Sequence, residues 1–132
     1  MSTLKTGTVQ NNTGTGAPVF KNSAGTEIGQ LAKAWVNFDG SGTVAIRDSF
    51  NVSSITDSAT GTYVVNISNA LSNSNYAVTA NSLHLQGVYL AFPTLRDRDQ
   101  QTRSTTQFQI DCLNNSATTV DGQELHIAIF GA

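Results

Sequence analysis

The chain has 132 residues, only 12% of them charged, and a formal net charge of −2 at pH 7. This length corresponds to a single domain, and a charge so close to neutral provides no basic surface for holding a nucleic acid. Polar residues are mainly Thr, Ser, Asn and Gly rather than Lys and Glu, which favours a β-protein with many turns and excludes a helical bundle.

Residues 1–33 are predicted to form an extended N-terminal arm, and residues 34–132 the folded domain. Apolar residues are sparse in the arm, where Val19 and Phe20 are two adjacent large apolar residues. They are too few to offset an ordering cost of about 1–2 kcal/mol per residue, yet more numerous than a free linker needs. We therefore expect the arm to be ordered by a partner subunit or another protein. No apolar run follows Lys5, so neither a signal peptide nor a membrane span is expected.

Residues 34–55 show the clearest pattern in the chain, two strands of alternating character around an Asp-Gly turn. Asp39-Gly40-Ser41-Gly42 has the residues of a tight hairpin, because Gly adopts the positive φ angles that such turns require. The expected inward-facing positions are Ala34, Val36, Phe38, Val44, Ile46, Phe50 and Val52. An interruption of the second strand is expected near Asp48 and Ser49, since a charged pair inside a continuous buried strand is costly unless it lies on the outer face or at a bulge.

Three segments carry a family resemblance: KAWVNFDGSGTVAIRDSFNVSSITD at 33–57, GTYVVNI at 61–67 and NSNYAV at 73–78. They resemble a module of small virion proteins of tailed bacteriophages, many of them marine or cyanobacterial, found in tail-fibre-like and other virion surface proteins. Residues 1–30 are similar to the leader of such proteins, so the resemblance covers about the first 80 residues. It implies a non-enzymatic structural role on the virion.

Further strands are expected every ten residues or so, with polar turns between them. The predicted strands cover residues 61–67, 76–80, 82–93, 105–113 and 124–130. This spacing predicts an all-β, antiparallel sandwich or jelly-roll-like domain of about seven to nine strands. The strand aromatics Trp35, Phe38, Tyr63 and Tyr76 are assigned to its core.

Residues with catalytic or metal-binding chemistry are few and scattered. Cys112 lies in an alternating apolar run, which indicates a small buried thiol. His84 and His126 stand alone among apolar residues and are expected to face outward, and Asp97 and Asp99 alternate with arginines that cancel the charge a cation site needs. No Gly-x-Ser-x-Gly motif is present. We therefore expect no enzyme activity, no catalytic residue, no metal site and no cofactor.

Candidate partner-binding residues fall in two places, the apolar pair of the arm and the segment around the arginine-rich stretch 95–104. Alternating charges in such a stretch suit pairing across an interface. The candidates are Val19, Phe20, Tyr89, Phe92, Arg96, Arg98 and Arg103.

Three functions remain open from the sequence. The first is a tail-fibre-like, receptor-binding or attachment module on the virion surface; the second is a capsid cement or decoration protein; the third is a free carbohydrate-binding, lectin-like domain.

Strands that are apolar on both faces favour self-association as a homotrimer. Expected partners are further copies, other virion proteins of tail or capsid, and a host surface glycan or protein, but neither nucleic acid nor membrane. The expected location is the virion, after assembly in the host bacterial cytoplasm, and the sequence does not decide between head and tail.

Overall fold

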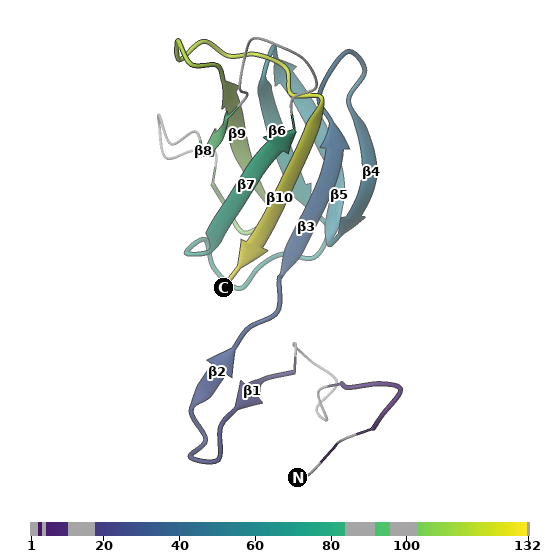
Figure 1. Cartoon of the computed structure of the whole chain (residues 1–132), viewed down its shortest axis with the longest axis vertical. Helices are drawn as coiled ribbons and strands as arrows, with labels where there is room; N and C mark the ends of the chain where they lie inside the picture. Colours follow the sequence, from purple (N-terminus) through teal and green to yellow (C-terminus); the bar gives the residue numbers. More distant parts are fainter. Residues whose placement is uncertain (1–2, 4, 11–17, 84–91, 96–102, 132) are drawn as a thin grey trace. The chain divides into compact units, whose positions relative to one another are not determined.

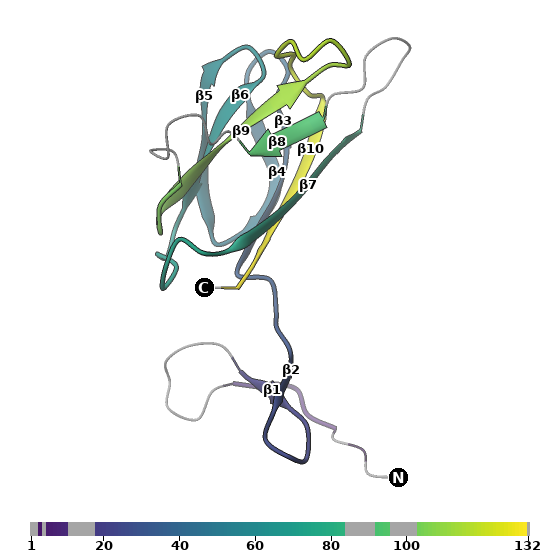
Figure 2. The ribbon, with the colours of Figure 1, turned by 90° about the vertical axis from the view of Figure 1, so that its left-hand side faces the viewer.

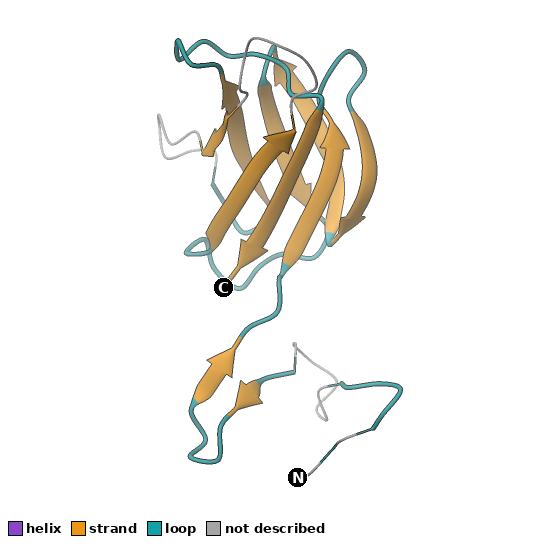
Figure 3. Ribbon diagram, viewed as in Figure 1, coloured by secondary structure: helices purple, strands orange, loops and turns teal. Residues whose placement is uncertain are grey.

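The computed structural model describes residues 3, 5–10, 18–83, 92–95 and 103–131. The chain divides into two units, Met1–Leu31 and Ala32–Ala132. Within the described ranges every regular element is a strand (Figure 3), which confirms the predicted all-β class. No helix in this part of the chain is long and apolar enough to cross a membrane.

The first unit contains a small antiparallel hairpin, β1 (Phe20–Lys21) and β2 (Glu27–Gly29). Asn22 organises its turn, because its side-chain Oδ1 accepts the amide hydrogens of Ala24 and Thr26, both at 3.0 Å. Gly25 has φ +81°, a conformation that favours glycine. The prediction of an extended arm did not include this hairpin, whose side chains are all exposed and therefore give no apolar alternation.

The second unit is a sandwich of two four-stranded antiparallel sheets (Figures 1 and 2). The first sheet has the order β4-β3-β10-β7, with β4 Ala45–Phe50, β3 Ala34–Asp39, β10 Glu124–Phe130 and β7 Ala77–Leu83. The second has the order β5-β6-β9-β8, with β5 Val52–Ala59, β6 Thr62–Ile67, β9 Gln107–Leu113 and β8 Phe92–Leu95. The C-terminal strand β10 lies between β3 and β7, so it ties the end of the chain into the middle of a sheet.

The core lies between the sheets and takes every second residue from the central strands. Its largest fully buried side chains include Phe38, Tyr63 and Phe108. The Phe38 and Tyr63 rings meet edge to face with centroids 5.3 Å apart, so the aromatic contact joins the two sheets. The alternation predicted for residues 34–38, 61–67, 105–113 and 124–130 is confirmed, because the inward positions of β3, β6, β9 and β10 are buried.

The alternation predicted beyond Ile46 is wrong for Phe50, whereas Val52 at the start of β5 is buried as predicted. The pairing moves from Phe38↔Ile46 to Asn37↔Asp48, so Arg47 is an extra residue in a β-bulge that reverses which side chains face inward. Phe50 consequently lies opposite Trp35 and is 54% exposed, while Ile46 on this edge strand is 38% exposed. The bulge lies directly before Asp48 and Ser49, where the sequence predicted an interruption or a bulge.

The strand β4 ends at Phe50, directly before Asn51, and not at Asp48-Ser49 as predicted. Asn51 has φ +55° and marks the point at which the chain passes from the first sheet to the second. Its side-chain Nδ2 donates to the carbonyl of Lys33 at 3.0 Å, and its Oδ1 accepts the amide hydrogen of Asn69 at 2.7 Å. Asn tolerates this left-handed conformation and its amide bonds fix the corner, so the residue type suits the position.

A single strand across residues 82–93 is also wrong. Residues 82–83 end β7 in the first sheet, whereas 92–93 begin β8 in the second. Pro93 is accommodated because β8 is an edge strand, where a missing N–H breaks no ladder on the open side.

Candidate functional site

The outer face of the sheet β4-β3-β10-β7 carries two rows of side chains that cross all four strands. Residues directly opposite in antiparallel strands project to the same face, so the register defines each row. The first row is polar and consists of Asp48, Asn37, His126 and Asn81. The second row consists of Phe50, Trp35, Ala128 and Thr79. The two rows are two residues apart along each strand, so polar side chains lie directly beside a row of aromatic and short side chains.

A hollow of about 370 Å³ lies between these rows. Its lining comprises residues 35–37 of β3, 48 of β4, 79–81 of β7 and 126–128 of β10. The second row explains the hollow, because Ala128 and Thr79 are short side chains beside the large indole of Trp35. We call this feature the outer-face hollow.

Trp35 lies on the outer face, which contradicts its assignment to the core. Its neighbours in sequence, Ala34 and Val36, are 0% and 2% exposed, whereas Trp35 is 36% exposed. Strand geometry sends successive side chains to opposite faces, so Trp35 cannot share the inward face of its neighbours. The other three aromatics that were assigned to the core, Phe38, Tyr63 and Tyr76, are at most 2% exposed, which confirms their assignment.

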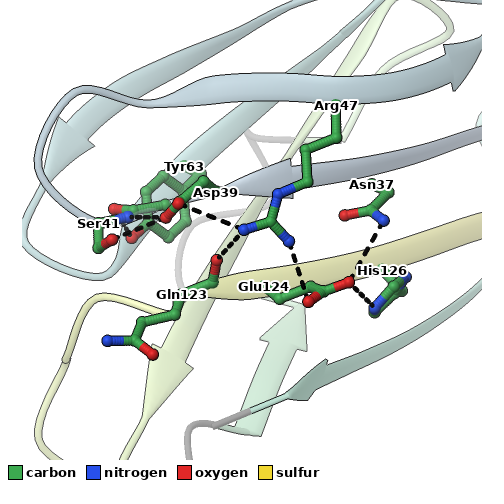
Figure 4. Close-up of polar contacts among 9 residues, drawn as sticks. Asn37, Asp39, Ser41, Arg47, Tyr63, Gln123, Glu124 and His126 are labelled. Atoms are coloured by element: carbon green, nitrogen blue, oxygen red, sulfur yellow. Dashed lines mark hydrogen bonds and ion pairs between the residues drawn. The ribbon is translucent and has the colours of Figure 1, made fainter. Parts of the chain in front are cut away.

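An ion-pair network borders the hollow at the turn end of the sheet (Figure 4). The bulged Arg47 contacts Glu124 at 3.0 Å and Asp39 at 3.3 Å, so one guanidinium bridges strands β3 and β10. Glu124 Oε1 also lies 3.2 Å from Nε2 of His126 and accepts a hydrogen bond from Nδ2 of Asn37 at 3.4 Å. Glu124 therefore positions two side chains of the polar row.

Asp39 connects this network to the hairpin turn. Its Oδ1 accepts hydrogen bonds from the hydroxyl and the amide of Ser41, at 2.7 and 2.9 Å. These two bonds, and then the nearby Arg47 guanidinium, hold the pKa of Asp39 below its ordinary value. The carboxylate thus stays ionised and keeps Arg47 directed across the sheet.

The candidate partner residues are divided between the two units of the chain. Val19 and Phe20 belong to the unit Met1–Leu31 and are 55% and 45% exposed. Arg103 belongs to the sandwich, where its guanidinium lies 4.3 Å from the centre of the Tyr76 ring. It therefore packs on a core aromatic. The predictions for Tyr89, Arg96 and Arg98 fall outside the described residues, as do those for His84, Asp97 and Asp99, and of Phe92 only the strand position is described.

Cys112 is fully buried, which confirms the prediction of a small buried thiol. Burial, followed by the charges of Asp111 and Asp121, raises its pKa to about 12. The reactive thiolate is therefore suppressed at neutral pH. In the described part of the chain no three His, Cys, Asp or Glu side chains gather as a metal site would require.

This burial predicts that thiol reagents will modify Cys112 only when the sandwich opens. At pH 8 we expect native protein to react with a thiol-specific reagent at least about a thousandfold more slowly than protein in urea, since access requires nearly global unfolding. A colorimetric thiol assay measures both rates. Rapid labelling of folded protein would contradict the burial of this strand.

No protein-family model, no curated protein and no solved structure matches this chain.

Proposed function

We propose that the protein is a non-enzymatic structural protein on the surface of a phage virion, with a tail-fibre-like attachment role. The resemblance in residues 33–78 suggests this role, and its segments coincide with strands β3 to β6 and the start of β7. The observation that supports it most is the division into a sandwich with its own core and a small unit whose apolar side chains Val19, Phe20 and Ile28 are exposed. In this proposal the small unit attaches to another virion protein and the sandwich is displayed.

The second candidate is a capsid cement protein, for which the same exposed apolar residues would lie across neighbouring capsid subunits. A homotrimer suits either role, because Ile46, Phe50 and Phe130 leave apolar surface on the sandwich outside the lining of the hollow. Electron microscopy of phage particles with antibody-labelled protein distinguishes tail from head. Absence of label from both would refute the proposal in both forms.

Attachment through the small unit predicts that polar substitution of its apolar pair releases the protein from the virion. The double variant Val19→Thr and Phe20→Thr keeps β-forming residues but removes apolar surface, and we expect its incorporation to fall by about tenfold or more, equivalent to about 1.4 kcal/mol. Mass spectrometry of gradient-purified particles measures incorporation. Lys21→Thr, in the same strand β1, is the matched control and should incorporate normally. Equal incorporation of all three proteins would refute attachment through this unit.

A further inference from the structure

The outer-face hollow combines an exposed aromatic ring with hydrogen-bonding side chains fixed on rigid strands. Trp35 stands at one side and is 36% exposed, while Asn37, Asp48, Asn81 and His126 form the polar row along the other. Its volume of about 370 Å³ lies at the small end of the range for small-molecule sites, about 300–1,000 Å³. The hollow thus has the size and the mixed chemistry of a site for a small polar molecule.

The polar row is positioned and still has hydrogen-bonding capacity. Glu124 contacts both Asn37 and His126, which limits the rotation of these two side chains. Asn37 Oδ1 is buried and has no hydrogen-bond partner among the described residues. Asp48 uses Oδ1 for the amide hydrogen of Ser49, at 2.8 Å. A carboxylate accepts several hydrogen bonds, so Asp48 still presents acceptors to a donor in the hollow.

The charges around the hollow select against anions. In the described part of this face Asp39, Asp48 and Glu124 carry carboxylates, whereas the Arg47 guanidinium is paired with Asp39 and Glu124. Bringing a phosphate, sulfate or carboxylate ligand beside Asp48 would cost free energy through like-charge repulsion. The hollow therefore suits a neutral molecule with hydroxyl groups.

We propose that the outer-face hollow binds a neutral glycan. A pyranose ring has an apolar C–H face, which stacks on the indole of Trp35, and hydroxyl groups at its rim, which hydrogen-bond to the row of Asp48, Asn37 and Asn81. The short side chains of Ala128 and Thr79 provide the space for the ring. The binding itself does not depend on the proposed function. Only the role of the sugar as a receptor rests on it, because that role requires the sandwich to be displayed on the virion.

The test uses the full chain and methyl glycosides of glucose, galactose, mannose and N-acetylglucosamine. We expect at least one of them to shift the NMR signals of the Trp35 indole and of residues 79–81 and 126–128, with a Kd of about 1 mM, as is typical of a weak single-ring contact. Trp35→Ala should weaken this binding at least about tenfold. Ala128→Leu should weaken it similarly by filling the space, without removing any polar contact.

Phe130→Ala is the matched control for Trp35→Ala. Phe130 is an aromatic residue of the neighbouring strand β10, has a similar exposure of 39% and does not line the hollow. It should change the affinity less than about twofold. The inference is overturned if none of the four glycosides shifts these signals, if Trp35→Ala and Phe130→Ala have equal effects, or if sialyllactose or heparin binds more tightly than the neutral sugars. It is also overturned if Trp35→Ala changes only the oligomeric state, because the face is then a contact between copies.

These outcomes are independent of where the protein resides. Sugar binding by a protein that is absent from the virion would retain the glycan site and refute the proposed function, leaving a free lectin. A protein that is present on the virion but binds no sugar would support the proposed function and overturn the glycan site.

Discussion

Replacing Phe38 by Ala is expected to destabilise the sandwich by about 3–5 kcal/mol, a large part of the about 5–15 kcal/mol that stabilises a typical domain. Phe38 is 0% exposed, and its ring meets Tyr63 of the opposite sheet. Truncation removes apolar burial and this edge-to-face contact, and it leaves a cavity between two rigid sheets that collapse poorly. Urea unfolding followed by circular dichroism measures the loss.

Phe50→Ala is the control, because Phe50 is also an aromatic residue of the β3–β4 hairpin but is 54% exposed. We expect its cost to be below about 1 kcal/mol. The comparison tests the bulge at Arg47 directly, since an uninterrupted alternation would bury both rings. Equal losses for the two variants would show that the bulge is wrongly placed.

Gly61→Ala is expected to cost about 3 kcal/mol or more, through two effects that add. Gly61 has φ +68°, where a side chain is strained, and a Cβ there would lie 2.5 Å from N and 2.6 Å from O of Val120. Neither backbone segment can move easily. Gly61 donates its amide hydrogen to Asp121 at 2.7 Å and accepts that of Cys112 at 2.7 Å, while Val120 donates to the Cys112 carbonyl at 2.9 Å.

Gly42→Ala separates the two effects. Gly42 has a similar φ of +62°, but no atom lies within 4 Å of the place that an alanine Cβ would occupy, so only the backbone strain of about 1–2 kcal/mol applies. Thermal and urea unfolding of both variants give the difference. If Gly61→Ala is no more damaging than Gly42→Ala, the close approach of the loop at Val120 to the β5–β6 turn is not maintained in solution.

The local pattern of the sequence was sufficient for the class of fold and for most of the core. Period-2 alternation in residues 34–38, 61–67, 105–113 and 124–130 identified four central strands and their inward faces, because burial on one side of a strand requires that period. Asp-Gly and the flanking glycine similarly identified the first hairpin. The buried state of Cys112 followed from its place in such a run.

The outer-face hollow was decided by tertiary structure alone. Its polar row takes one residue from each of four strands that are separated in sequence by between a few and many tens of residues, and only the order β4-β3-β10-β7 and its register bring them side by side. The core assignment of Trp35 is wrong because it follows residue type, which favours burial of a large aromatic ring, although the alternation with Ala34 and Val36 already places Trp35 outward. The charges near Asp48 indicated an irregularity in this strand, but only the register of β4 against β3 shows that it is a bulge and that Arg47 is the extra residue. Alternation indicates which face of the sheet a side chain occupies, whereas a site depends on which strands are neighbours. The neighbours are determined only in the folded sheet, where β10 pairs with both β3 and β7.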